Sequence, residues 1–154
     1  MNYIKDFFGN YVLISAILGW GIAQILKIFS GTLSTRRFHI KYMFSNGGMP
    51  SSHSATVLAL TTSLAIQEGF ASPYFAIAAI LSVIVMNDAF GVRWETGKQA
   101  TIINRIVKEL FSGNPDDVNT GLKELVGHTP FQVLMGGIVG VVVALLYGVI
   151  IGAL

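Results

Sequence analysis

Long apolar segments constrain this sequence more than any other feature. Residues 11–29 contain a single charged side chain, Lys27, and no charged side chain follows Thr129. Each segment is long enough to cross a bilayer, which takes about 20 residues of helix. Since hydrocarbon offers no partner for backbone N–H and C=O groups, we expect these segments to be helical. The share of hydrophobic residues, 53% of 154, supports the same conclusion.

Two more helices are predicted between these segments, over residues 52–67 and from Pro73 to about Met86. Gly69 ends the first of them. The sequence therefore predicts an all-α integral membrane protein, a helical bundle with about four transmembrane helices. We expect residues 1–154 to form a single multi-pass domain in the cell membrane.

Residues 98–126 differ from this pattern and are predicted to be an amphipathic insertion. Polar side chains such as Arg105 and Glu109 fill one face of a helix, and apolar side chains fill the other. We expect this helix at the membrane interface, with its apolar face on the cytoplasmic leaflet or against a neighbouring subunit. A shorter helical stretch around Leu122 follows it. The apolar residues at helical spacing are Ile102, Ile103, Ile106, Val107 and Leu110.

Basic side chains gather in two of the connecting segments. Residues 30–50 and 93–126 hold most of the Lys and Arg residues, whereas residues 68–72 hold none. By the positive-inside rule, the two basic segments are predicted to be cytoplasmic and both termini to lie outside. A net charge of +2 is too small to indicate a nucleic-acid partner. The absence of cysteine excludes disulfides and zinc–cysteine sites.

Glycines in the last apolar segment are spaced as small-xxx-small pairs, a pattern typical of close helix packing. Such packing occurs within one chain or between chains, so a homo-oligomer formed through this face is one expectation. The residues are Gly136, Gly140, Gly148 and Gly152.

The segment GGMPSSHSA, residues 47–55, carries a chemical signal. A glycine turn and a proline bring Ser51, Ser52 and His53 to the start of a helix. Free backbone N–H groups and the helix dipole favour an anion there, and an imidazole suits a phosphate. The alternative interpretation of these residues is helix capping alone.

A second histidine, His128, precedes Thr129 and Pro130, which form another helix start. The predicted topology places His128 at the same membrane face as His53, so we expect two helix N-termini to converge on one anion. A divalent-metal site would have suitable ligand types but no metal-specific spacing, and we predict none. The other polar residues expected at this face are Asp88, Arg93 and Glu124.

The run PSSH resembles the P-S-G-H motif of the type 2 phosphatidic acid phosphatases, a membrane superfamily related to the vanadium haloperoxidases. GHTPFQVLMGG, residues 127–137, is similar to the histidine half of the third family motif, and Arg93 in VRWETG is similar to its arginine half. The amphipathic insertion separates the two halves. Together, GGMPSSHSA, NDAFGVR and ELVGHTPFQV resemble the divergent branch of this superfamily.

The resemblance implies a phosphatase in which His128 attacks phosphorus to form a phosphohistidine and His53 protonates the leaving oxygen. A phospholipid or prenyl phosphate, as a phosphomonoester or pyrophosphate, would be the substrate, with its tail in the bilayer. No metal or cofactor is required. The groups that would neutralise the phosphate oxygens are Arg93, the amides of Ser51 and Ser52, and the side chains of Arg37, Lys41 and Lys123.

Three departures from the family pattern affect this chemistry. Ser52 replaces a glycine, and Gln132 replaces the aspartate that orients the nucleophilic histidine. The first family motif, a lysine followed by Arg-Pro, is absent, which leaves Lys27 among nearby basic candidates. Glu124 or Asp88 would supply the missing carboxylate. The alternative function is a catalytically degenerate member that binds phospholipid headgroups or a partner protein without turnover.

Overall fold

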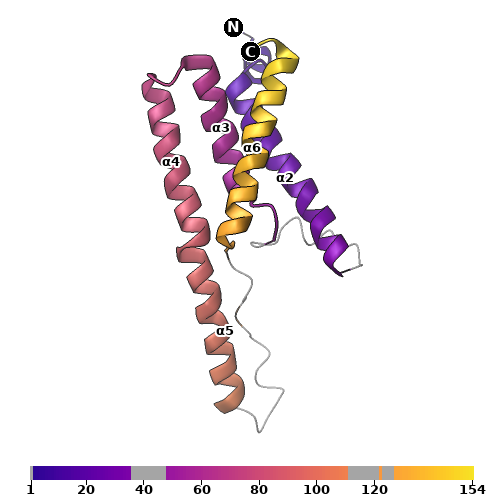
Figure 1. Ribbon diagram of the computed structural model, residues 1–154, viewed down its shortest axis with the longest axis vertical. Coiled ribbons are helices and arrows are strands. Elements are labelled where there is room, and N and C mark those ends of the chain that lie inside the picture. Colours follow the sequence, from indigo (N-terminus) through magenta and orange to yellow (C-terminus); the bar gives the residue numbers. More distant parts are fainter. Residues whose placement is uncertain (1, 36–47, 111–121, 123–126) are drawn as a thin grey trace.

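The computed structural model describes residues 2–35, 48–110, 122 and 127–154. Every regular element within these residues is an α-helix (Figure 1). This arrangement confirms the all-α membrane architecture predicted from the sequence. The helices are α1 (Tyr3–Phe8), α2 (Tyr11–Thr35), α3 (Ser52–Glu68), α4 (Pro73–Phe90), α5 (Val92–Leu110) and α6 (Pro130–Ile151).

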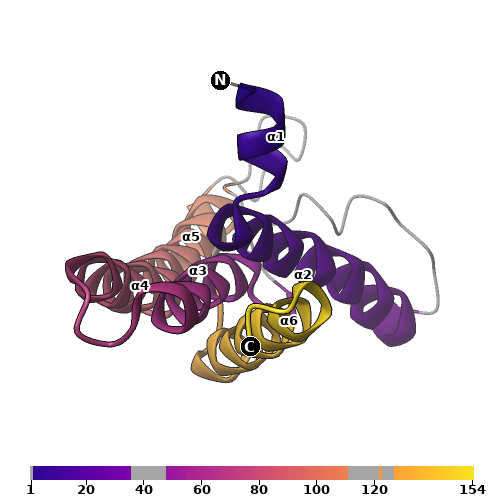
Figure 2. The ribbon, with the colours of Figure 1, turned by 90° about the horizontal axis from the view of Figure 1, so that it is seen from above.

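Among the described residues, three helical runs are long and apolar enough to cross a membrane: Tyr11–Leu33, Pro73–Leu110 and Pro130–Ile151. The fourth expected span, α3, has 17 residues, which corresponds to about 25 Å of helix. Figure 2 shows α3 between α4, α2 and α6, and it packs against all three. The shortest of these four helices is therefore the centre of the bundle.

Small residues allow α3 to occupy this central position. A Cβ atom at Gly136 or Gly140 of α6 would overlap the carbonyl oxygens of Ser51 and Ala55. On the other side, a Cβ atom at Gly19 of α2 would lie 2.9 Å from the Ala55 oxygen. The predicted pair Gly136 and Gly140 is thus used for close packing within the chain, whereas an added Cβ at Gly152 would meet nothing within 4 Å. Assembly between copies stays a prediction.

Side-chain caps fix the beginnings of the three helices that follow the connectors. Ser51 caps α3, and its hydroxyl accepts a hydrogen bond from the Ser54 amide. Ser72 caps α4 in the same way, immediately before a proline at the first helical position. Thr129 caps α6 and forms a reciprocal capping box with Gln132. Each cap satisfies backbone N–H groups that have no partner within the helix.

The amphipathic helix α5 begins earlier in the sequence than predicted. It begins at Val92 rather than near residue 98, and it continues the line of α4 beyond the end of the bundle (Figure 1). Hydrogen bonds from Gly91 to Asn87 and from Glu95 to Gly91 carry the helical pattern across the junction. The helix therefore extends α4, and its predicted contact with the cytoplasmic leaflet or a neighbouring subunit stays a prediction.

Leu122, which follows α5 in the sequence, lies beside this helix. The Asn104 side chain accepts a hydrogen bond from the Leu122 amide and donates one to the Leu122 carbonyl, both 2.8 Å long. Leu122 itself is not helical, and the rest of the second helical stretch predicted there lies outside the described residues. Both chain ends lie at the opposite end of the bundle from α5 (Figure 1).

Candidate functional site

Two histidines far apart in the sequence meet at one end of the bundle. The ring centroids of His53 and His128 are 6.4 Å apart, and the rings are inclined at 63°. The meeting follows from the way α3 and α6 begin. The Ser51 amide donates a hydrogen bond to the Gln132 carbonyl, 3.1 Å long, and the bare backbone of Gly136 lets the two helix starts approach.

The backbone around His128 is held against the junction of α4 and α5. The His128 amide donates a 2.9 Å hydrogen bond to the Ala89 carbonyl. Gly127 has a φ of +87°, and a Cβ atom there would overlap the backbone of Arg93 and Trp94. A glycine is therefore required at this position for both conformation and space. These contacts bring the end of α4 into the same site as the starts of α3 and α6.

The imidazole of His128 is buried, with 2% of the residue exposed, whereas His53 is exposed. Burial, and then the positive charge of Lys27, lower the pKa of His128 from 6.5 to about 4. The Gln132 side chain and the Gly48 backbone oppose this decrease only in part. The ring is consequently neutral at pH 7 and retains a nitrogen lone pair. Within the described part of the chain, its Nδ1 atom is buried without a partner at hydrogen-bonding geometry.

A third helix contributes Lys27 to the site. This lysine of α2 is only 3% exposed, and Gln24, one turn earlier on the same helix, is also buried. Lys27 was predicted only as one of several nearby basic residues. A stronger signal was available, because a cation within an apolar span faces protein or water and is typically functional. The spacing of Gln24 and Lys27 places both on one helix face.

Arg93 and Asp88 form an ion pair at the junction of α4 and α5, through Nε and Oδ2. Their side chains are 45% and 39% exposed, so this cation remains accessible from outside. Asp88 was predicted as a partner that orients a histidine. The structure pairs Asp88 with Arg93, and a role of Asp88 toward a histidine stays a prediction.

Ser51 and Gln132 have structural roles at the site. Ser51 is fully buried, its hydroxyl is the cap of α3, and its amide is bonded to the Gln132 carbonyl. The Gln132 side-chain oxygen accepts a 3.1 Å hydrogen bond from the Thr129 amide. Ser52 is the first residue of α3, where the geometry of a helix leaves its amide without an intrahelical partner. The remaining predicted site residues, Arg37, Lys41, Lys123 and Glu124, lie outside the described residues.

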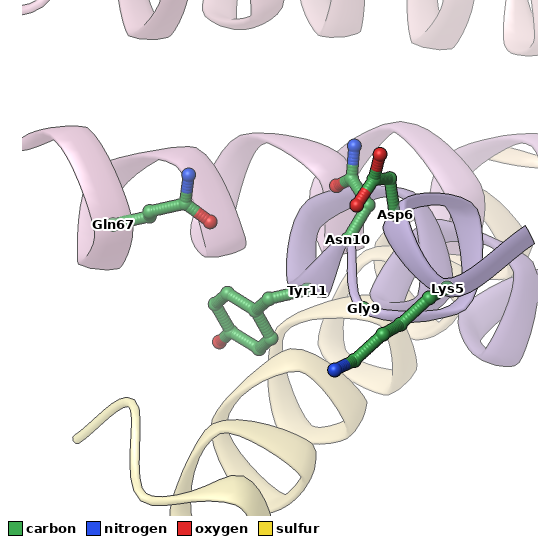
Figure 3. Close-up of a pocket in the computed structure, with 6 residues that line it drawn as sticks. All are labelled: Lys5, Asp6, Gly9, Asn10, Tyr11 and Gln67. Carbon is green, nitrogen blue, oxygen red and sulfur yellow. The ribbon is translucent and has the colours of Figure 1, made fainter. Parts of the chain in front are cut away.

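Other features of the described residues do not add to this site. No group of three or more His, Asp or Glu side chains among them is arranged to hold a metal ion. A cavity of about 610 Å³ lies near the chain ends, at the start of α2 (Figure 3), and it contains none of the predicted site residues. Its lining includes Lys5, Asp6, Asn10, Tyr11 and Gln67.

The site combines a neutral buried imidazole, an exposed imidazole, two cations and two helix N-termini. Positive charges and free backbone N–H groups favour an anion, and a neutral imidazole can act as a nucleophile toward phosphorus. The arrangement therefore suits a phosphate group at the end of the bundle.

Comparison with known proteins agrees with these features. The model of the divergent PAP2 family matches residues 8–143. The chain is 38% identical over 146 residues to YuiD of Bacillus subtilis (strain 168), which is described as an uncharacterized membrane protein. That match covers 88% of this chain and 92% of the relative. No solved structure matches the chain. Because the family model spans most of the sequence, this membrane protein belongs to the divergent PAP2 family.

Proposed function

We propose that this protein is a membrane phosphatase that hydrolyses a lipid-linked phosphomonoester or pyrophosphate. The observation that carries the proposal is the meeting of His53 with a buried, neutral His128 beside Lys27. The 6.4 Å between the ring centroids is short enough for both imidazoles to contact one phosphate group. Family membership supports the same reaction class.

In the proposed reaction, a nitrogen of His128 attacks phosphorus, and the bond from phosphorus to the leaving oxygen breaks. Protonated His53 gives its proton to that oxygen. Neutral His53 then removes a proton from a water molecule, which attacks the phosphohistidine and releases inorganic phosphate. Lys27 and Arg93 stabilise the negative charge on the phosphate oxygens during both steps.

Lys27 takes the place of the basic residue that the missing first family motif would supply. Its charge acts on both histidines from within α2, and its burial strengthens this electrostatic effect. The basic residues of α5, which include Arg93, favour a site at the cytoplasmic face of the membrane.

A second function, binding of a phosphorylated lipid headgroup without turnover, is favoured by one observation. Within the described residues, Asp88 is held in an ion pair with Arg93 and Gln132 carries no charge, so neither replaces the negative charge of the family's orienting aspartate. In serine proteases, loss of the carboxylate behind a catalytic histidine lowers the rate by about 10⁴.

Phosphate release by the purified protein distinguishes these functions. Wild type, His128→Ala and His53→Ala would be compared on a panel of lipid phosphates and pyrophosphates, with Gln67→Ala at the other end of the bundle as control. The phosphatase proposal predicts release by wild type and the control, and a loss of at least about 100-fold in each histidine variant. A variant with both histidines replaced by alanine gives the background. If wild type releases no more phosphate than this background on any substrate but still binds phosphatidic acid vesicles, the second function is established.

A further inference from the structure

The six-residue helix α1 has an apolar face and a polar face. At about 100° per residue, the apolar side chains lie within an arc of about 140°, and the two charged side chains lie on the remaining surface. The charged residues, Lys5 and Asp6, line the cavity at the start of α2 (Figure 3). The polar face of α1 is therefore turned toward the protein, and the apolar face is turned away from it. The apolar residues are Tyr3, Ile4, Phe7 and Phe8.

The described part of the chain leaves most of this apolar face uncovered. No residue of α1 is buried, and its four apolar residues are between 49% and 74% exposed. Figure 2 looks along the long axis of the bundle and shows α1 running outward from the start of α2, away from α3, α4 and α6. The helix thus lies across the end of the bundle instead of packing along it.

A helix as short as α1 needs an apolar surface beside it. In water, the cost of nucleation exceeds what so few backbone hydrogen bonds return, so an isolated helix of this length is not stable. A membrane interface removes the apolar face from water and stabilises such a helix. The helix α1 is joined directly to a membrane span, since it ends at Phe8 and the span begins at Tyr11. Tyrosine is enriched at membrane interfaces, and phenylalanine is typical of the apolar face of interfacial helices.

We infer that α1 lies flat in the headgroup region of the leaflet at the end of the bundle that carries both chain ends, with its apolar face in the lipid. The charges of Lys5 and Asp6 cancel, so the apolar surface supplies the attraction and anionic lipid is not required. This membrane contact does not depend on the proposed phosphatase activity, because the histidines lie at the other end of the bundle.

An interfacial α1 also sets the depth of α2 in the bilayer. Tyr11 then lies at the boundary of the hydrocarbon, and Lys27 lies about 24 Å further along the helix. Since the hydrocarbon is about 30 Å thick, Lys27 lies a few ångströms inside the opposite boundary. The candidate site is consequently within reach of the headgroups of the opposite leaflet.

Fluorescence quenching tests which face of α1 contacts lipid. Because the chain has no cysteine, a single cysteine at Phe8 or at Asp6 can carry an environment-sensitive label in phosphatidylcholine vesicles. A nitroxide near the headgroup end of the acyl chains quenches a label in the lipid, and iodide quenches a label in water. We expect the nitroxide to quench the label at Phe8 at least about threefold more than the label at Asp6, and iodide to show the reverse order. Equal quenching at the two positions would overturn the inference. Nitroxide quenching at Phe8 that weakens as the protein is concentrated in the membrane would also overturn it, because a second copy would then cover this face.

Amide hydrogen exchange tests whether the lipid stabilises the helix. The amides of Asp6 and Gly9 form the backbone hydrogen bonds at the two ends of α1. In phosphatidylcholine nanodiscs, we expect them to exchange at least about tenfold faster in Ile4→Ser/Phe8→Ser than in wild type. The matched control, Lys5→Ser/Asp6→Ser, makes the same change on the polar face and should stay within about twofold of wild type. Equal exchange rates in the two variants would contradict the inference, as would protection of wild type that appears only when phosphatidylglycerol is added.

Discussion

At the scale of single residues, the site depends on the environment of His128. Its ring is buried next to Lys27, and these two factors lower its pKa to about 4. An unfolded chain has an ordinary histidine, with a pKa near 6.5. As the pH falls from 6.5 to 4, the unfolded state binds a proton that the folded state does not, so stability decreases over this range. The loss attributable to His128 is at most about 3 kcal/mol.

Replacement of Lys27 tests this electrostatic coupling. Lys27→Met keeps the length of the side chain and removes its charge, so we expect the pKa of His128 to rise toward 6.5. The protein then loses stability over a narrower pH range, because the lower limit of this range is the pKa of His128 in the folded protein. Histidine NMR titration in detergent and unfolding at several pH values measure the two effects. Lys98→Met, which removes an exposed lysine paired with Glu95, is the control and leaves the pKa of His128 unchanged. An unshifted His128 titration in Lys27→Met would show that the two side chains are not coupled.

At the scale of helices, the site depends on how closely α6 approaches α3. Gly136 faces the Ser51 carbonyl, which is backbone and does not move aside as a side chain end does. Gly136→Ala should therefore destabilise the folded protein by about 1–3 kcal/mol and separate the two histidines. Gly21→Ala on α2 is the matched control, because a Cβ atom there meets no other atom within 4 Å. Thermal unfolding in detergent would compare the variants; equal midpoints for both would disprove the tight contact.

The elements that sequence analysis placed correctly are those with a local start signal. Ser51 after a proline, and Thr129 before one, begin α3 and α6 where they were expected. The direction of α5 could not be predicted, because Gly91 suits either a break or a continuing helix and only tertiary packing decides between them. Gln132 was ambiguous for a similar reason. The same amide can orient a histidine or cap a helix, and here its oxygen bonds to Thr129 while the side chain also interacts with His128.

At the scale of the whole molecule, the candidate site and α5 lie at one end of the bundle, and both termini lie at the other (Figure 1). Arg93 and the other basic residues of α5 lie at the site end, and the positive-inside rule predicts that this end is cytoplasmic. This assignment requires α3 to cross the hydrocarbon region, although it is one of the shorter helices. Its 17 residues span about 25 Å against about 30 Å of hydrocarbon. Since α2, α4 and α6 surround α3, its ends can be covered by protein where it falls short.

The absence of native cysteine makes this topology directly measurable. Single cysteines at Met49 and Gln99 should react with an impermeant maleimide only after the cytoplasmic side is opened. Cysteines at Asn2 and Ala71 should react in intact cells, because α3 and α4 each change the side of the membrane. Met49 and Ala71 flank α3 on exposed positions, so this pair decides whether the short helix spans. If the cysteines at Met49 and Ala71 were labelled from the same side, α3 would not cross the membrane. The histidines and the chain ends would then lie on one face, and the four-helix topology with a cytoplasmic site would be refuted.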